Sequence, residues 1–243
     1  MTNTTVTDFH CHILPGIDDG SRNLETSLQM LQMEWEQGIR RIVCTPHFYA
    51  HRDRVDDFLA RRQQAFEQVQ EALQKKNPAD FPACQMQFRL GAEVAFFQGI
   101  SRAGQLKELT IEGTKNLLLE MEFCPWDKHV IEELDDITNL GYTIILAHLE
   151  RYFGFGENKR YIKEMLDMDK VYVQINAETL LDWKSRGKPM KMFRKGQAHL
   201  LGSDSHGAHH RIPNLGPGRE ALAAKLGEDI LEEIDERGDR LLT

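Results

Sequence analysis

The sequence predicts an α/β fold, a distorted TIM-like (β/α)7 barrel. Three observations predict it. Seven short apolar runs are mostly separated by stretches with helical spacing of apolar residues, which is the pattern of parallel β/α units. Runs such as 143–147 are apolar throughout, as expected of strands covered on both faces. The 243 residues suit one barrel, and no linker or low-complexity stretch divides them, so we expect a single domain over residues 1–243.

The first half of the chain alternates apolar runs with amphipathic stretches. Each apolar run is short and leads into a polar residue, which is typical of a strand that ends at a barrel rim. The three strands expected here are 6–9, 41–45 and 86–93. Between them, apolar residues three and four positions apart predict two helices with charged outer faces. These helices are expected at 23–39, where Gly38 lies near the end, and at 55–73.

The second half repeats the pattern with shorter helices. Four further strands are expected at 116–120, 142–147, 171–176 and 199–203. Helical spacing predicts helices at 130–140, closed by Gly141, and at 161–166. The tail, 219–237, is expected to be helical and leads to no further strand.

Composition and charge exclude several classes of protein. The net charge of −8 argues against a nucleic-acid surface, although a cationic pocket for an anionic substrate remains compatible with it. The four cysteines form no Cys-x-x-Cys pair, so neither a zinc finger nor a secreted disulfide framework is indicated. No run of 18 apolar residues suggests a membrane span, and the polar N-terminus does not resemble a signal peptide. We therefore expect a reducing, cytoplasmic setting.

Imidazoles and carboxylates stand at or just beyond the ends of the predicted strands. In the first of these, period-two alternation is expected to place Asp8, His10 and His12 on one side and Cys11 on the other, in the core. Because the carboxyl ends of barrel strands meet at one face, we expect a common cluster there. Its nine members are His10, His12, Asp19, His47, Glu93, Glu120, His148, Asp204 and His206.

This set predicts a multinuclear metal site. It mixes imidazole and carboxylate without thiolate, which suits zinc, manganese or iron, and nine ligands are too many for one ion. Glu93 is the first candidate for a bridging ligand. Such a cluster lowers the pKa of water and clamps the oxygens of a phosphoryl displacement, which favours phosphate ester hydrolysis. Arg151, three residues past His148, and Arg211, five past His206, are candidates for contacting the phosphate.

These motifs, taken together, resemble the polymerase and histidinol phosphatase (PHP) family of metal-dependent phosphoesterases. The likeness is greatest to its bacterial protein-tyrosine phosphatase branch, linked to capsule and exopolysaccharide synthesis. The matching segments run in order over nearly the whole chain. They are Asp8-Phe9-His10-Cys11-His12, Asp18-Asp19-Gly20, Thr45-Pro46-His47, Gly91-Ala92-Glu93, Leu119-Glu120, Ala147-His148-Leu149-Glu150-Arg151-Tyr152, Gln174-Ile175-Asn176 and Ser203-Asp204-Ser205-His206.

The resemblance implies a distorted barrel with three divalent ions, usually described as manganese. One ion would be held by His10, His12, Glu93 and Asp204, a second by Glu93, Glu120 and His148, and a third by Asp19, His47 and His206. Two alternatives stay open, since Asp18 can replace Asp19 and Glu122 is expected on the same strand face as Glu120. The implied substrate is a phosphotyrosine protein, a tyrosine autokinase that controls polysaccharide export, with phosphate as the product.

The chemistry of the leaving group agrees with an aryl phosphate. A tyrosine phenol has a pKa of about 10, so it leaves with less acid assistance than an aliphatic alcohol. His206 or a water molecule can donate the proton that is still needed. Several aromatic residues lie beside the strand ends. Some of them can form the wall of a slot for a flat ring. Packing in the core accounts for the position of most of them. They are Phe48, Tyr49, Phe96, Phe97, Tyr152, Phe153 and Phe155.

Three other functions compete with this interpretation. A histidinol-phosphatase-like enzyme would use the same metals on a small aliphatic phosphomonoester. A metal-dependent amidohydrolase also begins with His-x-His, but it typically has a strand-end lysine or another histidine order, and the Asp-x-His ending with Asp19 favours phosphoester chemistry. A barrel that only stores metal or binds a kinase would require an occluded mouth or an incomplete ligand set.

Overall fold

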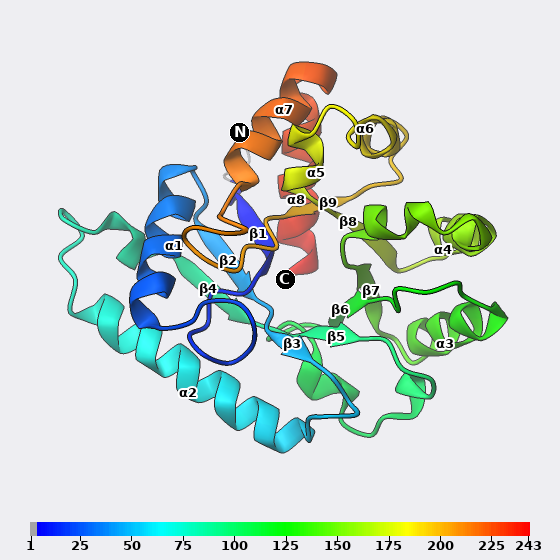
Figure 1. The fold of residues 1–243 in the computed structure, drawn as a ribbon, viewed down its shortest axis with the longest axis horizontal. Coiled ribbons are helices and arrows are strands. Elements are labelled where there is room, and N and C mark those ends of the chain that lie inside the picture. Colours follow the sequence, from blue (N-terminus) through cyan, green and yellow to red (C-terminus); the bar gives the residue numbers. More distant parts are fainter. Residues whose placement is uncertain (1–3) are drawn as a thin grey trace.

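The computed structural model describes residues 4–243 and contains parallel strands in two curled sheets, surrounded by helices (Figure 1). Nine strands lie within these residues. They are β1 (Thr7–Cys11), β2 (Arg41–Cys44), β3 (His47–Phe48), β4 (Gln87–Leu90), β5 (Glu93–Ala95), β6 (Asn116–Glu120), β7 (Thr143–Leu146), β8 (Val171–Asn176) and β9 (Leu200–Gly202). The predicted α/β barrel of parallel strands is therefore confirmed.

The strands form two sheets that join into one distorted barrel. One sheet has the order β1-β2-β4 and the other β3-β5-β6-β7-β8-β9. A parallel bridge between Cys11 and Ser205 links the end of β1 to the segment after β9. This link brings the first and last strands together, so that residues from the two ends of the chain share one rim.

The strand expected at 41–45 ends before Pro46 as predicted, whereas the strand expected at 86–93 is interrupted. Pro46 has no N–H to continue the ladder, so β2 ends at Cys44 and the chain resumes pairing as β3 at His47. The single strand expected at 86–93 is wrong, because β4 ends at Leu90 and Glu93 instead begins β5. These short breaks move the chain from one sheet to the other between the barrel wall and its rim.

The helices lie outside the strands, and eight α-helices fall within residues 4–243. They are α1 (Leu24–Glu36), α2 (Val55–Gln74), α3 (Lys128–Asn139), α4 (Lys159–Leu166), α5 (Ala177–Leu181), α6 (Gly187–Arg194), α7 (Leu215–Leu226) and α8 (Asp229–Leu241). Short 3₁₀ helices include η4 (Leu149–Gly154), which follows β7. Among these residues, no helix combines the length and apolar character needed to cross a membrane.

The tail and the segment after β8 differ from the prediction. The single helix expected at 219–237 is wrong, because Gly227, with φ +96°, ends α7 and the chain restarts as α8. Helices α5 and α6 were not predicted from the sequence. The first is only five residues long, and the second is only eight, with Gly187 and Pro189 in its first turn.

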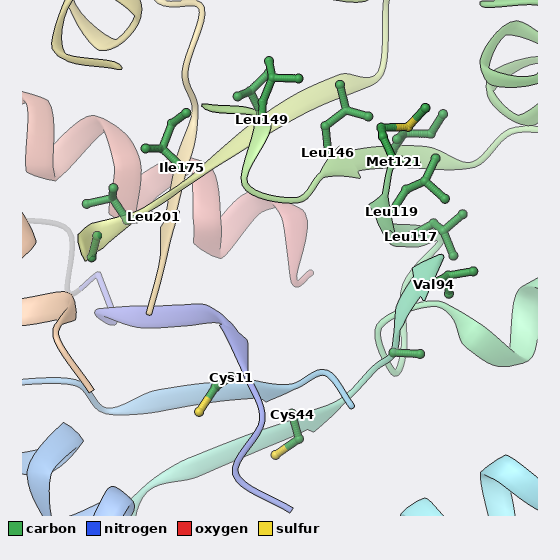
Figure 2. Packing of buried hydrophobic residues seen from close by; sticks show 14 of the residues in the cluster. Cys11, Cys44, Val94, Leu117, Leu119, Met121, Leu146, Leu149, Ile175 and Leu201 are labelled. Atoms are coloured by element: carbon green, nitrogen blue, oxygen red, sulfur yellow. The ribbon is translucent and has the colours of Figure 1, made fainter. Parts of the chain in front are cut away.

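The core has two layers because successive strand residues point to opposite sides. Leu117 and Leu119 pack with the helices in the outer layer, whereas Leu118 packs with Phe9 and Ile145 inside the barrel. Figure 2 shows outer-layer side chains along the strands, including Cys11 and Cys44. Both cysteines are fully buried, which confirms the core position expected for Cys11 and gives Cys44 the same one.

Candidate metal centre

All nine of the side chains singled out at the strand ends lie together at one rim of the barrel. They fall into four overlapping groups in which one nitrogen or oxygen atom of each member lies within 4.8 Å of the others. The groups are His12, Asp19, His47 and His206; His10, Glu93 and His148; His10, His12 and Asp204; and His47, Glu93 and Glu120. Segments as distant as β1 and the loop after β9 thus share one site.

Glu93 is the centre of the cluster. Its Oε2 atom lies 3.1 Å from His10 Nε2, 3.2 Å from His12 Nε2 and 2.9 Å from His47 Nδ1. Its Oε1 atom lies 2.8 Å from His148 Nε2. Burial by itself would raise the pKa of this carboxyl, but the surrounding imidazoles outweigh burial and hold its pKa well below the usual value. Glu93 is therefore a fully buried carboxylate shared by four histidines.

The second buried carboxylate, that of Asp204, completes the group around His10 and His12. Its Oδ1 atom lies 3.5 Å from the Nε2 atom of each histidine. Asp204 and His148 have positive φ angles, 51° and 33°, and the nearby Arg211 has 46°. Left-handed backbone costs free energy in residues other than glycine and is retained at functional sites where it aims side chains.

A more exposed group lies beside this buried centre. Asp19 Oδ1 lies 3.4 Å from His47 Nε2 and 3.5 Å from His206 Nε2. The side chain of Asp19 is 67% exposed, so this part of the cluster faces the solvent. His206 Nδ1 donates a hydrogen bond to the Asp204 carbonyl at 2.9 Å, which leaves the Nε2 lone pair directed toward Asp19.

Glu120, at the end of β6, stands on the other side of Glu93. Its carboxylate lies 3.6 Å from His148 Nε2 and 4.0 Å from His47 Nδ1. Burial, together with the negative charge of Glu93, raises the pKa of Glu120 to about 7. One carboxylate oxygen of Glu120 lies within 4.8 Å of one of Glu93. Two carboxylates this close repel each other unless positive charge lies between them, so the arrangement favours a cation.

The alternatives left open by the sequence are separated by this geometry. Asp18 accepts hydrogen bonds from His12 Nδ1 at 2.8 Å and from the His47 and Gly20 amides, so its carboxylate orients the cluster from behind while Asp19 faces it. Glu122 lies beyond the end of β6 and is exposed, and the expectation that it shares the strand face of Glu120 is wrong.

The expected position of Asp8 is also wrong. A register irregularity between Asp8 and Cys11 breaks the alternation of β1. The Asp8 carboxylate consequently lies within 4.8 Å of Cys11 and Glu34, on the side of α1, and not with His10 and His12. It accepts hydrogen bonds from the amide and the hydroxyl of Ser203, at 2.9 and 2.5 Å, which ties β1 to the segment that carries Asp204.

Two amide side chains of β8 support the site, and the sequence analysis gave neither a role. Gln174 Oε1 accepts a hydrogen bond from the His148 amide at 2.8 Å and lies 3.1 Å from His10 Nδ1. Asn176 donates to Asp204 Oδ2 at 2.7 Å. A signal for Gln174 was present in the sequence, because it is a polar residue inside an otherwise apolar strand and therefore needs buried partners.

Arg151 and Arg211 both reach the cluster from its outer edge. Each guanidinium contacts Oδ2 of Asp204, Arg211 at 2.7 Å, while about 40% of each side chain stays exposed, 38% and 39%. The two cations thus flank the same carboxylate at the solvent boundary. An anion that approached the cluster from solvent would meet both.

A cavity of about 510 Å³ opens beside Asp19 and His47. Tyr49 and His51 line it, and the Tyr49 ring lies 5.3 Å from the His47 ring. Of the other aromatic candidates, Phe48 and Tyr152 are core residues, 2% and 1% exposed. Tyr49 therefore has a better position than Phe48 or Tyr152 to contact a flat ring at the site.

The donor set fits divalent cations. Glu93 Oε2, Asp204 Oδ1 and His206 Nε2 are buried and have no hydrogen-bond partner among residues 4–243. The two carboxylate oxygens lie 3.1–3.5 Å from Nε2 of His10 and His12. In His10 and His12 the Nδ1 atoms face Gln174 and Asp18, so the Nε2 lone pairs face the cluster. Outer hydrogen bonds of this kind orient histidines that bind metals. Buried, unsatisfied acceptors facing one another are stabilised by metal ions between them.

Comparisons with known proteins agree with this site. A family described as capsular polysaccharide synthesis, CpsB/CapC, matches residues 6–240. The tyrosine-protein phosphatase CpsB of Streptococcus agalactiae is 28% identical over 241 residues, which cover 93% of each protein. The tyrosine-protein phosphatase YwqE of Bacillus subtilis is 26% identical over 242 residues, which cover 97% of this chain and 91% of YwqE.

A solved structure shares the fold over almost the whole chain. It comes from the crystal structures of YwqE from Bacillus subtilis and CpsB from Streptococcus pneumoniae, which are described as unique metal-dependent tyrosine phosphatases. The TM-score is 0.84 at 23% sequence identity, over 98% of this chain and 94% of the other. The resemblance inferred from the sequence is confirmed, and the chain belongs to the capsular polysaccharide synthesis CpsB/CapC family.

Proposed function

We propose that this chain is a metal-dependent tyrosine-protein phosphatase, with residues 1–243 acting as one catalytic domain. The observation that carries the proposal is the gathering of nine imidazole and carboxylate side chains around Glu93, with two arginines at their outer edge. The tyrosine-protein phosphatases named CpsB and YwqE, which are related over nearly the whole chain, support the same activity.

We propose three divalent ions, manganese first, with iron or zinc as alternatives. His10, His12, Glu93 and Asp204 would hold one, Glu93, Glu120 and His148 a second, and Asp19, His47 and His206 a third. The absence of thiolate from the set supports these metals over a structural cysteine-zinc site. When bound, such ions supply an activated water nucleophile and stabilise the charge that develops on the phosphoryl oxygens.

The protein's own groups have separate tasks around the ester. Arg151 and Arg211 would exchange their contacts with Asp204 for the non-bridging phosphate oxygens and hold the phosphoryl group in line. Asp18 and Gln174 would keep the His12 and His10 lone pairs directed into the cluster. His206 was a candidate proton donor, but its Nε2 lone pair faces Asp19, which supports a ligand role and leaves the donor to water.

The substrate we propose is a phosphotyrosine protein, specifically a tyrosine autokinase of capsule or exopolysaccharide synthesis. Tyr49 beside the cluster suits an aryl phosphate, and so does the placing of the titratable groups of the site as candidate metal ligands, because a phenolate leaves with little assistance. We place the enzyme in the cytoplasm. The four unpaired cysteines support a reducing setting.

Hydrolysis of a phosphotyrosine peptide, compared with hydrolysis of histidinol phosphate, tests this proposal. With manganese supplied, we expect the peptide to be the better substrate by at least about tenfold in kcat/KM. His148→Ala should remain folded, because the side chain lies at the rim and not within the strand layers, and should lose most turnover. Faster hydrolysis of histidinol phosphate would favour the small-substrate alternative, and undiminished turnover by His148→Ala would contradict its role as a ligand.

A further inference from the structure

The segment after α5 concentrates positive charge on a chain whose net charge is −8. Six exposed cationic residues occur within twelve positions, and no acidic residue occurs between 183 and 203. They are Lys184, Arg186, Lys188, Lys191, Arg194 and Lys195. Trp183, which precedes them, is 73% exposed. An exposed tryptophan beside a cluster of cationic side chains is a composition typical of a binding surface.

Four of these cations, all but Lys184 and Lys188, border a groove between α6 and α7, which lie side by side in Figure 1. The groove has a volume of about 720 Å³. Its floor is apolar, from Met190, Ala221 and Ala224, and its lining contains no carboxylate. Five cationic side chains surround this floor, namely Arg186, Lys191, Arg194, Lys195 and Lys225. We name this feature the α6–α7 groove.

A direct contact connects the basic segment to the rim of the metal centre. Lys188 Nζ lies 3.3 Å from the centroid of the Phe153 ring. Phe153 belongs to η4, the same short helix that carries Arg151. A polypeptide bound at the metal centre can therefore follow the surface from Arg151, past Lys188, into the groove.

We infer that the α6–α7 groove binds an acidic stretch of the substrate protein, on one side of its phosphotyrosine, and so selects substrates by charge. This inference rests on the proposed phosphatase function. The concave shape and apolar floor fit a polypeptide strand better than a flat bilayer. Positive charge on two helices attracts carboxylates or further phosphates on that strand and speeds its capture.

Charge reversal in the groove tests the inference. Lys191→Glu/Arg194→Glu would be compared with wild type on two phosphotyrosine peptides, one flanked by aspartates and one by serines, and on p-nitrophenyl phosphate. We expect the aspartate peptide to lose about tenfold or more in kcat/KM, mostly through KM, and more strongly at low salt. The serine peptide and p-nitrophenyl phosphate place no negative charge in the groove, so kcat/KM for them should change by less than about twofold. A third peptide, with phosphotyrosines as the flanking anions, distinguishes phosphate from carboxylate recognition.

A matched variant controls for long-range electrostatics. Lys75→Glu/Lys163→Glu makes the same change in charge at two exposed sites, the C-cap of α2 and α4. Equal losses in this control, or equal losses on p-nitrophenyl phosphate, would overturn the inference. The inference would also be overturned if the groove variant kept the wild-type kcat/KM for the aspartate peptide.

Direct binding separates this inference from the proposed activity. Fluorescence anisotropy with an unphosphorylated, aspartate-rich peptide should show an affinity that the groove variant loses and the Lys75/Lys163 control keeps, whether or not the protein hydrolyses phosphotyrosine. Absence of hydrolysis by wild type would defeat the proposed function alone. Binding of wild type to phosphatidylglycerol vesicles, in place of the peptide, would identify a membrane as the occupant and overturn the inference.

Discussion

The side-chain oxygen of Gln174 lies 3.1 Å from Nδ1 of His10 and fixes which nitrogen of that imidazole carries the proton. The same oxygen accepts a hydrogen bond from the His148 amide at 2.8 Å, so the oxygen end of the side chain must face both histidines. Its NH₂ group donates to Asn176 Oδ1 at 2.9 Å. One buried amide on β8 therefore orients a candidate ligand from β1 and another that follows β7.

Replacement of Gln174 by methionine should weaken metal binding without unfolding the protein. Methionine keeps the volume but removes the acceptor for His10 Nδ1, and loss of such a partner typically lowers metal affinity by about 10- to 100-fold. Manganese titration followed by calorimetry measures the change. Gln74→Met, at an exposed position at the end of α2, is the control and should bind manganese normally. Wild-type affinity in Gln174→Met would show that His10 needs no such orientation.

Substitution of Gly202 by alanine should damage both stability and activity. A Cβ atom there would lie 2.6 Å from His10 Cβ and 2.8 Å from Gln174 Nε2, so β1 or β8 must shift. We expect a loss of about 1–3 kcal/mol in the free energy of unfolding, the usual cost of overpacking a core, and a larger proportional loss of turnover. Urea denaturation and phosphatase assays measure the two. Gly104→Ala, where the new Cβ meets nothing within 4 Å, should leave both within error.

Loss of either rim arginine should raise KM more than it lowers kcat. Arg151 and Arg211 contact Asp204 from the solvent boundary and lie outside the four ligand groups. A charge-assisted contact is worth about 1.5–3 kcal/mol, so Arg211→Ala should raise KM for an aryl phosphate by about 10- to 100-fold. Inhibition by inorganic phosphate should weaken in parallel. Arg89→Ala, exposed on β4, serves as the comparison. A change confined to kcat would indicate that the arginine acts on the chemical step and not on phosphate binding.

Much of the site could be predicted because it depends on topology. Parallel strands deliver their carboxyl ends to one rim, so His47, Glu120 and His148 could be grouped without any knowledge of their distances. The failures arise where local geometry overrides periodicity. The irregularity in β1 turned Asp8 toward α1, and the interruption after Leu90 made Glu93 the first residue of β5. Neither carries a sequence signal as strong as a proline or a glycine pair.

Supporting contacts were harder to predict than the candidate ligands. Gln174 contacts Nδ1 of His10, which lies far from it in the sequence, and Asp18 contacts Nδ1 of His12, the ring nitrogen that faces away from the cluster. Both roles depend on the directions of hydrogen bonds, which the sequence does not show. The basic helix α6 was missed for another reason. It is only eight residues long and contains Gly187 and Pro189, two residue types that disfavour a helix.

The buried carboxyl of Glu34 should make the stability of the protein fall as pH rises. Glu34 is fully buried on α1, within 4.8 Å of the Asp8 carboxylate, and neither of its oxygens has a hydrogen-bond partner among residues 4–243. Burial first, and then the negative charge of Asp8, raises the pKa of Glu34 well above its usual value. The folded protein therefore keeps a proton on Glu34 that the unfolded chain releases above its own pKa of about 4.3.

Unfolding in that range releases a proton, so the free energy of unfolding decreases as pH rises from the unfolded pKa toward the raised, folded one. The slope is at most about 1.4 kcal/mol per pH unit for one group. Glu34→Gln removes the titration, so its stability relative to wild type should increase steadily between pH 5 and 8 in urea denaturation. Glu36→Gln, exposed on the same helix, should show a constant difference. A constant difference for Glu34→Gln as well would mean that Glu34 is ionised in the folded protein, with its charge balanced by a neighbour.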